Sequence, residues 1–451
     1  MENWMKPMDL AKRTVDLGRR AGVDDVICVV IDSERRQIRF ANNQITVSKA
    51  WFDRTVKLYV AKDRRIITSE EKVSDYESLS LSLKRMVENV KLLREIPGYT
   101  SIPKGPFRYP STNLYYDKRV VSDEDKLFES VEVAINSAIE NGGCRVSGVL
   151  IAECFTRTLV STGGIEVEEK GTRIAMTVRA FADEKGEAQG MGVTVSRRID
   201  GIDPEGAGKE AGQIARDMLK TVKAEPGTYD AVLGPYFVAN LLSYCAYLFS
   251  AFFVDMGVSP FVGKLGQRIA SEKITVIDDP HLPDGYNSHI FDDEGYPTQR
   301  NFLIKEGVLK TYVHNGITAK KFGVNRTGNA GWEMPLPWNI VIREGDRRTE
   351  ELIEDLQEGF YFLNTWYTRF QNYITGDFST IPRDGIFYVK NGEIVGSVRG
   401  VRVAGNIIKL FEDINGVSRE IKQVYWWETP VPVLSSTISV RGIKVTKAYG
   451  A

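Results

Sequence analysis

GVDDVICVVIDSERRQIRFANNQITVSKAWFDRTVKLYVAKD runs from Gly22 to Asp63, and this stretch decides the predicted fold of the first half of the chain. Apolar runs over 26–31 and 36–40 predict two strands, and Asn42-Asn43 predicts a turn. From Ile45 to Val60, apolar and polar residues alternate as they do in a half-buried strand. The stretch therefore predicts an antiparallel hairpin.

Helical patterns flank this hairpin. Before it, Asp9–Ala21 has apolar residues among basic ones; after it, a polar turn at 62–65 is followed by Tyr76–Leu93, where apolar residues recur at helical spacing. Helices that cover one face of a sheet are typical of an α+β domain.

The same order of elements returns later in the chain, in GGCRVSGVLIAECFTRTLVSTGGIEVEEKGTRIAMTVRAFAD from Gly142 to Asp183. Helical patterns lie on either side of it, at 127–139 and 211–222, and Gly163-Gly164 predicts the turn. The two copies align with one constant offset, which pairs Gly22 with Gly142, Val26 with Val146, Ile45 with Ile165, Leu58 with Val178 and Asp63 with Asp183. Helix–hairpin–strand–helix is a common arrangement, but a register held over so many positions favours a duplication.

The domain organisation follows from two breaks in the pattern. Residues 97–122, rich in Pro, Gly, Tyr and Lys, predict a loop that connects the two copies, so that 1–223 form one duplicated α+β domain. Glu225-Pro226-Gly227 ends the last helix and opens a second domain, 224–451. A length of 451 residues is typical of two or three domains.

The second half is predicted to be rich in β-structure. A strand at 229–233 and an apolar helix at 237–254 are followed by short strands with Gly, Asp and Asn turns. We expect strands at 273–277, 302–304, 311–313, 339–342, 360–365, 373–375, 385–390 and 438–445. Thr349–Leu356 predicts a short helix with Thr349 as its N-cap. The predicted fold class is α+β, with a mainly antiparallel, barrel-like second domain.

The composition excludes some classes of function. The 59 Lys and Arg residues nearly balance the 60 Asp and Glu residues, giving a net charge of -1. Such a balance excludes a chain-wide electrostatic hold on nucleic acid or an anionic membrane. The pairs Arg35-Arg36, Arg64-Arg65 and Arg347-Arg348 are isolated, and we expect each to lie at a solvated turn.

Cysteine use and the N-terminus indicate a reducing compartment. The four cysteines form no C-x-x-C pair, and Cys28 and Cys154 lie in strand-like runs where buried thiols are expected. The N-terminus has no apolar core of a signal peptide, and 238–258 is too polar for a membrane span. We therefore expect a cytoplasmic protein.

Histidine is too rare for a familiar metal site. A zinc protease needs two histidines one helical turn apart, a third ligand and a Glu base, and His281, His289 and His314 provide no such pair. The loop 278–294 combines two of these histidines with six carboxylates, so a metal loop is one interpretation. The favoured interpretation is a loop whose Asp side chains bind its own backbone.

Other catalytic motifs are also missing. The sequence has no G-x-S-x-G elbow and no phosphate-binding G-x-x-x-x-G-K-[ST] loop. Gly190 and Gly192 are interpreted as turn residues, and the group Gly201, Gly206 and Gly208 as a helix entry. The residues alone therefore indicate no self-contained active site.

Aromatic residues in polar surroundings give one further signal, in NTWYTRFQNYITGDFS from Asn364 to Ser379. Such aromatics most often fill a core, and the second interpretation is a surface that binds a peptide or a partner. The candidate residues for that surface are Asn364, Trp366, Tyr367, Arg369, Gln371, Asp377 and Phe378.

The chain resembles the TldD/PmbA family in the order and spacing of several segments. These are DDPHLPDGYNSHIFDDEGYPTQRNFLIKEGVLKTYVHNGITAKKFG from Asp278, RTGNAG from Arg326, and ITGDFS followed by GIFYVKNGEIVGSVRGVRVAGNI. The resemblance extends over nearly the whole chain. It implies a protein related to metallopeptidases; the family also has the label "modulator of DNA gyrase", but nothing in this sequence supports direct DNA binding.

The branch is indicated by what the chain lacks. TldD-like members have H-E-x-x-x-H on a helix before S-x-F-x-G-x-x-G, which here is SPFVGKLG at 259–266. The helix before it, NLLSYCAYLFSAFFV at 240–254, has neither His nor Glu, and the late Cys ligand is absent because no Cys follows Cys245. The chain thus resembles the PmbA-like (TldE) branch, for which the resemblance implies no catalytic residue, cofactor or metal in this chain and zinc only in a TldD-like partner.

Three hypotheses follow. In the first, the chain is the non-catalytic subunit of a metalloprotease that degrades flexible peptides, including pro-peptides of small modified peptides, and it contributes the dimer interface and part of the peptide channel. In the second, it is a homodimeric peptide-binding or scaffold protein. In the third, it is an enzyme that uses the loop 278–294 in another way.

Overall fold

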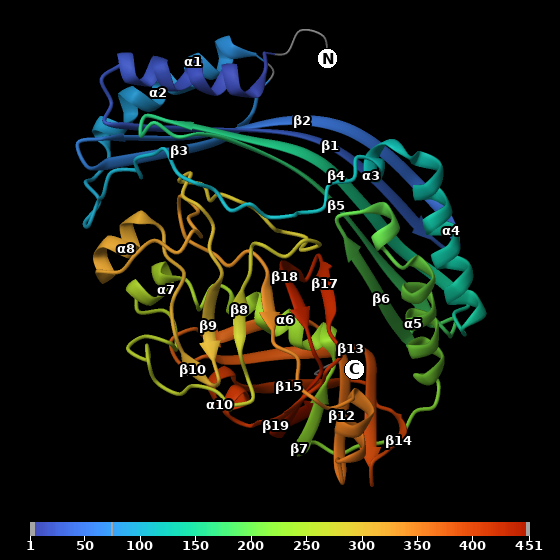
Figure 1. The fold of residues 1–451 in the computed structure, drawn as a ribbon. Coiled ribbons are helices and arrows are strands. Elements are labelled where there is room, and N and C mark those ends of the chain that lie inside the picture. The colour runs from blue at the N-terminus through green and yellow to red at the C-terminus, as the bar shows by residue number, and fades with distance from the viewer. Residues whose placement is uncertain (1–4, 74, 448–451) are drawn as a thin grey trace.

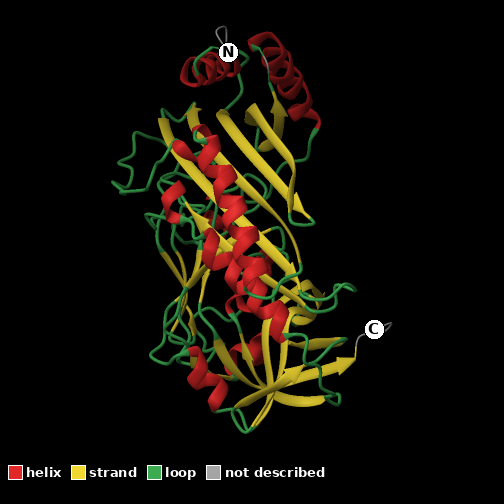
Figure 2. Ribbon diagram, turned by 90° about the vertical axis from the view of Figure 1, so that its right-hand side faces the viewer, coloured by secondary structure: helices red, strands yellow, loops and turns green. Residues whose placement is uncertain are grey.

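A long, curved sheet forms one side of the molecule, and the second half of the chain lies against its concave face (Figure 1). The computed structural model describes residues 5–73 and 75–447. Helices cover the outer, convex face of the sheet, as the side view shows (Figure 2). Among the described residues, no helix has both the length and the apolar character to cross a membrane.

The curved sheet is six-stranded and antiparallel, in the order β3-β2-β1-β4-β5-β6. Its strands are β1 Asp25–Ala41, β2 Gln44–Lys62, β3 Arg65–Lys72, β4 Arg145–Ser161, β5 Glu166–Phe181 and β6 Gln189–Ser196. The predicted turn at Asn42-Asn43 is confirmed, and both residues have positive φ. The separate strands predicted at 26–31 and 36–40 are wrong, because they form one strand whose polar middle is paired on both sides.

The duplication is confirmed by the order of elements. Helices α1 Pro7–Arg20 and α2 Tyr76–Asn89 flank the first hairpin as α4 Glu124–Glu140 and α5 Pro204–Asp217 flank the second. The central strands β1 and β4 pair with Glu34 opposite Cys154. These two positions are equivalent under the repeat offset, so the copies are related by a pseudo-twofold axis that passes between them.

The last helix of the repeat differs from the prediction of 211–222. It begins at Pro204, because Asp203 accepts a hydrogen bond from Gly206 N at 2.8 Å and proline at the first helical position lacks only an N–H that would be unpaired there. It ends at Asp217.

Two glycines allow α5 to approach the sheet closely. Gly190 and Gly192 were predicted in turns, which is wrong because both lie in β6. A Cβ at Gly190 would be 2.1 Å from Ala211 O, and one at Gly192 would be 2.0 Å from Ala207 O. The glycines are therefore required by helix–sheet packing rather than by chain reversal.

The connection between the copies, 97–122, contains only the short helix α3 Arg119–Ser122, and η1 Val90–Leu92 precedes it. It contacts the second half of the chain through Tyr115 N, which donates to Pro283 O at 2.9 Å, and through Tyr109 Oη, which donates to Gly295 O at 2.9 Å. The connection thus helps to hold the loop 278–294 against the sheet.

The second half contains a closed five-stranded barrel, which confirms the predicted fold class. The order β12-β7-β19-β15-β13 closes because β12 also pairs with β13. The barrel strands are β7 Gly227–Leu233, β12 Glu358–Asn372, β13 Asp377–Lys390, β15 Val401–Asn406 and β19 Ile438–Lys447, with β14 Glu393–Ser397 and β16 Ile414–Val417 at its edges.

A second sheet, in the order β10-β9-β8-β11-β18-β17, lies beside the barrel. Its strands are β8 Val276–Asp278, β9 Asn301–Lys305, β10 Val308–Leu309, β11 Ile340–Ile342, β17 Lys422–Trp426 and β18 Thr429–Ser435. One apolar core joins the barrel, this sheet and the helix α6 Pro235–Cys245, and it also includes Met191 and Val193 of β6. The division of the chain at 223/224 stays a prediction.

Four local predictions for the second half are wrong. The helix expected at 237–254 is split into α6 and α7 Ala251–Asp255. In the segment 311–313, Val313 forms only an isolated bridge with Ser250, and 373–375 is a turn. Helix α9 Thr349–Glu354 has Arg348 rather than Thr349 as its N-cap, because Arg348 N donates to the Glu351 side chain at 2.7 Å. The remaining helices are η2 Ile199–Gly201, α8 Gly316–Phe322 and α10 Ile407–Glu412.

Candidate functional site

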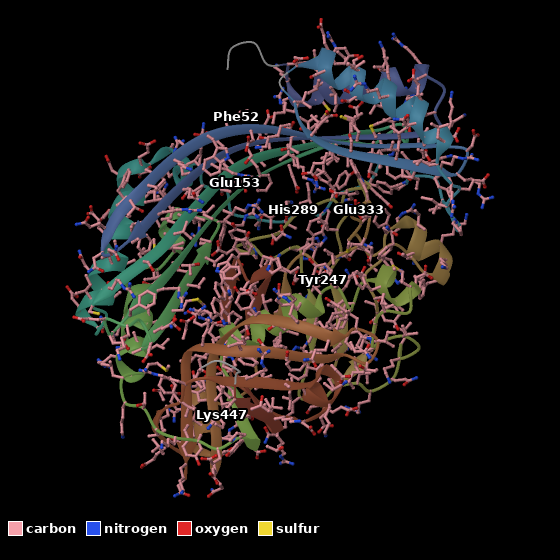
Figure 3. All side chains as sticks on the ribbon, turned by 180° about the vertical axis from the view of Figure 1, so that it is seen from behind. Phe52, Glu153, Tyr247, His289, Glu333 and Lys447 are labelled. Carbon is pink, nitrogen blue, oxygen red and sulfur yellow. The ribbon has the colours of Figure 1, made fainter. Side chains whose placement is uncertain are left out.

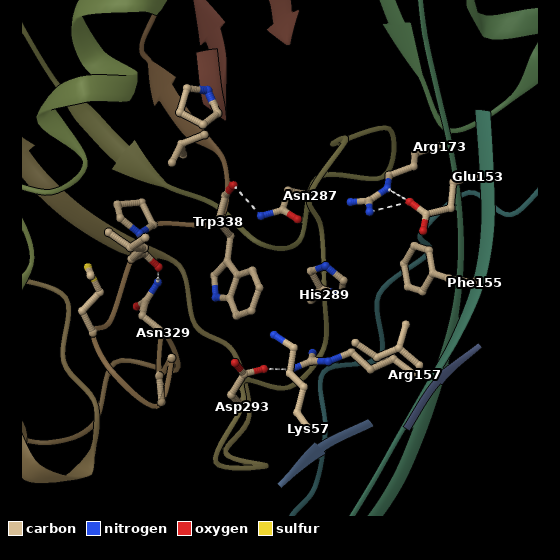
Figure 4. Close-up of a pocket in the computed structure, with 18 of the residues that line it drawn as sticks. Lys57, Glu153, Phe155, Arg157, Arg173, Asn287, His289, Asp293, Asn329 and Trp338 are labelled. Atoms are coloured by element: carbon tan, nitrogen blue, oxygen red, sulfur yellow. Dashed lines mark hydrogen bonds and ion pairs between the residues drawn. The ribbon is translucent and has the colours of Figure 1, made fainter. Parts of the chain in front are cut away.

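A cavity of about 390 Å³ lies between the concave face of the curved sheet and loops of the second half (Figure 4). This volume falls within the range of small-molecule and peptide-side-chain pockets. The sheet contributes Ile31, Arg35, Lys57, Glu153, Phe155, Arg157 and Arg173. The second half contributes Asn287, His289, Asp293, Asn329, Ala330, Gly331, Met334, Leu336, Pro337, Trp338, Pro430 and Val431.

The alternation of strand side chains explains which residues reach this cavity. Odd-numbered residues of β1 and β4 face it, whereas even-numbered ones such as Val30 and Leu150 pack beneath the helices. The expectation that Arg35-Arg36 lies at a solvated turn is therefore wrong, since both residues are in the middle of β1. Arg64 does lie in the turn between β2 and β3, and Arg65 is the first residue of β3.

Glu153 is the centre of the first ion cluster in the cavity. It accepts hydrogen bonds from Ser33 Oγ, from Arg35 Nε at 2.9 Å and from Arg173 Nε at 2.6 Å. Burial raises the pKa of this carboxyl, but the attraction of Arg173 and Arg35 outweighs burial and holds the pKa at about 2. Glu153 is thus ionised at neutral pH and neutralises much of the charge of the two arginines.

Arg157 is the centre of the second cluster, which joins the sheet to the loop 278–294. Its Nη1 lies 2.8 Å from Phe291 O and 3.2 Å from Glu169 Oε1, and its Nη2 lies 2.6 Å from Asp293 Oδ1. Charge-assisted bonds of this kind fix geometry more strongly than neutral ones. The loop is consequently held on the sheet by partners 134 and 136 residues apart in sequence.

His289 lies between the curved sheet and the second half of the chain (Figure 3), and its ring is among the side chains that line the cavity (Figure 4). Its ring centroid lies 4.9 Å from that of Trp338 and 5.7 Å from that of Phe155, and its Nδ1 lies 2.6 Å from Glu169 Oε1. Burial lowers the pKa of His289, and the carboxylate of Glu169 opposes this without cancelling it. Burial raises the pKa of Glu169, but His289 and Arg157 together hold it at about 2.

Some carboxylates of the loop 278–294 bind the loop's own backbone N–H groups, as the favoured interpretation expects, whereas others bind groups outside the loop. Asp279 Oδ1 accepts from His281 N at 2.9 Å, Asp284 Oδ1 accepts from Arg197 N at 2.7 Å, and Asp292 Oδ1 accepts from Glu294 N at 3.0 Å. In the described part of the chain, no three His, Cys, Asp or Glu side chains are grouped so as to hold a metal ion.

Asp278, the first residue of that loop, stabilises the wall of the cavity from behind. It is fully buried and accepts from Trp338 N at 2.7 Å and from Asn329 Nδ2 at 2.6 Å. Burial raises the pKa of this carboxyl to about 7, although the bonds from Asn329 and Trp338 oppose the rise.

The polar side chains of α6 do not fit zinc, and the one thiol of this helix, Cys245, is buried in the apolar core. Asn240 accepts from Thr368 Oγ1 at 2.5 Å and donates to Glu428 O at 3.0 Å, and Tyr244 Oη donates to Glu428 Oε2 at 3.0 Å. An amide and a phenol already bonded to the protein are not the imidazole, thiolate and carboxylate ligands that zinc takes.

The candidate residues from 364 to 378 lie on the hairpin of β12 and β13, and none lines the cavity. The structure brings Trp366, Tyr367 and Arg369 together: the Trp366 and Tyr367 ring centroids are 4.5 Å apart, and the Arg369 guanidinium is 5.7 Å from the Tyr367 ring.

The other candidates have internal partners. Asn364 is buried and donates to Asp384 at 3.0 Å, and Phe378 is buried in the core of the second half. Gln371 donates to Ser379 at 3.4 Å, and Asp377 accepts from Asn406 at 2.9 Å. Peptide or partner binding by the exposed members of the set stays a prediction.

Sequence reasoning missed the charged residues that line the cavity. Arg35, Glu153, Arg157 and Arg173 each occupy a strand position that faces inward, and their charges alternate with residues packed under the helices. The available signal was that Glu153 and Arg157, and likewise Glu169 and Arg173, are four residues apart and so lie on one face of their strand. The burial of Cys154 was also overestimated: it is half-buried, and its Sγ lies 3.5 Å from Tyr116 Oη.

The chain belongs to the PmbA/TldD metallopeptidase family. Residues 28–91 match domain 1 of the PmbA/TldA metallopeptidase, 116–219 match its central domain, and 226–447 match its C-terminal domain.

Individual relatives and one solved structure are similar to this chain at 22–28% sequence identity. An uncharacterised protein of Methanocaldococcus jannaschii is 27% identical over 90% of this chain and 94% of its own length. A metalloprotease of Methanothermobacter thermautotrophicus is 28% identical over 58% of this chain and 60% of its own length. The crystal structure of TldE from Thermococcus kodakarensis has the same fold, with a TM-score of 0.86 at 22% identity over 97% of this chain and 100% of that one.

Proposed function

We propose that the chain is the TldE/PmbA-like subunit of a TldD/TldE-type metallopeptidase, and that its cavity forms part of the channel that holds a flexible peptide. The proposal rests mainly on the residues of the helix α6 and on the hydrogen bonds that they make. The segment 240–254 has neither His nor Glu, and its polar residues Asn240 and Tyr244 are bonded to Thr368 and Glu428. The chain retains the fold and a cavity suited to binding, without the means to activate a water molecule.

In this proposal the catalytic zinc belongs to a TldD-like partner, and the complex works in the cytoplasm. The partner supplies hydrolysis, and this chain contributes an interface and a wall of the channel. Extended peptides are held by main-chain hydrogen bonds and shallow apolar pockets, and the cavity combines polar groups with Met334, Leu336, Pro337 and Trp338.

The test is a peptide-degradation assay with this chain alone, a TldD-like subunit alone and the two mixed, each with and without a chelator. We expect no cleavage by this chain, and chelator-sensitive cleavage that the mixture performs far faster than the partner alone. Cleavage by this chain alone would refute the assignment. Full activity of the partner alone would instead favour a separate homodimeric, peptide-binding protein.

A further inference from the structure

The two ring nitrogens of His289 differ in their hydrogen bonding to the described part of the protein. The residue is only 8% exposed, and Nδ1 is bonded to Glu169. Within residues 5–73 and 75–447, no hydrogen bond reaches Nε2, although the ring lines the cavity. Because Nε2 keeps accessible surface in the cavity, a water molecule or a ligand can satisfy it there.

The bond to Glu169 decides what Nε2 offers. An ionised carboxylate only accepts hydrogen bonds, so the proton must be on His289 Nδ1. In the neutral ring, Nε2 then has a lone pair directed away from Glu169, and it is an acceptor. Burial lowers the pKa of His289 and so disfavours a second proton on the ring, as do the nearby charges of Arg157 and Arg197, and both arginines are bonded to other partners.

The remaining groups of the cavity select against a charged ligand. Glu153 pairs with Arg35 and Arg173, Asp293 and Glu169 pair with Arg157, and Lys57 pairs with Glu70 at 3.3 Å, so each of these four cations has a carboxylate partner. Trp338 Nε1 donates to Gly328 O at 2.8 Å. The facing wall is apolar, with Met334, Leu336 and Pro337. A ligand that fits must be neutral overall, must donate a hydrogen bond and must carry an apolar group beside the donor.

A peptide backbone with an apolar side chain has these properties. We propose that His289 Nε2 accepts a hydrogen bond from a backbone N–H of an extended peptide, and that the apolar side chain next to that N–H packs against Trp338 and Met334. The inference rests on the proposed function and assigns one subsite within the channel. His289 is here a binding residue and takes no part in bond cleavage.

The test compares His289→Asn with the wild type in binding a fluorescein-labelled, unstructured peptide of glycine, serine and leucine residues. The Asn amide nitrogen takes the place of Nδ1 and continues to donate to Glu169, while the acceptor at Nε2 is lost. We expect binding to weaken about tenfold, as for one net hydrogen bond of about 1.4 kcal/mol. The matched control is His281→Asn, in the same loop but outside the cavity, which leaves binding unchanged.

Two further binding measurements test whether the hydrogen bond to Nε2 causes the difference in affinity. Methylating the peptide's backbone nitrogens one at a time weakens wild-type binding at one position, and the same change has no effect on His289→Asn. Wild-type affinity falls as acid protonates Nε2, whereas the affinity of His289→Asn does not follow that titration. Circular dichroism confirms that each variant is folded.

The outcomes separate the two proposals. If His289→Asn binds the peptide as tightly as the wild type, the subsite is refuted and the proposed function stands. If the wild type binds no peptide, alone or with a TldD-like subunit, the proposed function itself is refuted, and the subsite with it.

Discussion

Glu169 Oε1 lies 2.6 Å from His289 Nδ1, and this contact joins β5 of the curved sheet to a loop that follows 120 residues later. The same carboxylate accepts from Ile290 N at 2.9 Å and faces Arg157 Nη1 at 3.2 Å. The buried side chain of Glu169 therefore positions the loop, orients the imidazole of His289 and compensates the positive charge of Arg157.

We predict that Glu169→Gln destabilises the protein by roughly 3 kcal/mol, because removing one member of a buried charge cluster leaves the others without compensation. Glutamine retains the shape and one acceptor, so the fold persists. Urea denaturation measures the change. Glu168→Gln, the exposed neighbour on the same strand, is the control and changes stability by less than about 0.5 kcal/mol. Equal effects of the two substitutions would show that the buried cluster has no special role.

The pKa values predict where acid destabilises the protein. Glu153 and Glu169 have pKa values of about 2, below the ordinary value of 4.5, so the unfolded chain binds protons before the folded protein does. The stability that they contribute is complete above pH 4.5 and is lost as the pH falls towards 2, on the order of 3 kcal/mol for each group. The lowered pKa of His289 acts in the same direction, from its ordinary value of 6.5 downward.

Asp278 acts in the opposite direction but in a different window. Its pKa is raised from 3.8 to about 7, so its contribution favours folding below 3.8 and is lost as the pH rises to 7. Below pH 3.8 the two glutamates dominate the pH dependence of stability.

Denaturation series at several pH values should show a steep loss of stability in the wild type between pH 4.5 and 2, and a shallower one in Glu153→Gln and Glu169→Gln. If stability falls with pH equally in the wild type and in both variants, the lowered pKa values of Glu153 and Glu169 do not account for the acid sensitivity.

The packing of α5 on β6 gives a third prediction. Gly192→Ala places a methyl group 2.0 Å from Ala207 O, a contact that backbone must move to relieve. We expect a loss of about 1–3 kcal/mol, as for overpacking of a core. Gly405→Ala, whose new methyl would be 3.4 Å from the Phe378 ring, is the control with little effect. Thermal melting of both variants measures the difference, and similar melting temperatures would mean that the helix shifts without cost.

Local patterns predicted the duplicated hairpins, because the turn at Asn42-Asn43 and the alternation in each strand depend only on near neighbours. The role of Gly190 and Gly192 was not predicted, because the local sequence does not distinguish a glycine within a strand from a glycine in a turn. Only the approach of α5, far away in sequence, distinguishes the two.

The cavity could not be predicted for the same reason. Its walls come from β1, β2, β4 and β5 and from segments more than 100 residues later. Sequence reasoning recognised His289 and the polar loop around it, but the partner of Arg157 is Asp293, 136 residues away. The spacing of charges along a strand indicates that they face one way, and says nothing about which loop covers them.

Metal content gives a fourth prediction. Because α6 presents Asn240 and Tyr244 with internal partners, we expect the purified protein to hold no stoichiometric zinc. Elemental analysis after dialysis measures this, with a TldD-like protein as the positive control. One tightly bound zinc per chain, lost in His281→Asn or His289→Asn, would place a metal in the loop 278–294 instead.

The last prediction concerns Tyr367, which has a φ of 52° at a bulge in β12 and is 45% exposed. A bulky residue in this region is strained by roughly 1–3 kcal/mol, and strain of this kind persists where a side chain is needed. Tyr367→Gly relieves the strain, which offsets the entropy that glycine loses on folding, so we expect equal or slightly higher stability with weaker peptide binding. Tyr373→Gly, in the following turn and without positive φ, has no strain to relieve and should lower stability by about 1 kcal/mol. Chemical denaturation and peptide titration of both variants test this, and a Tyr367→Gly protein that is less stable yet binds peptide normally would make Tyr367 a structural residue only.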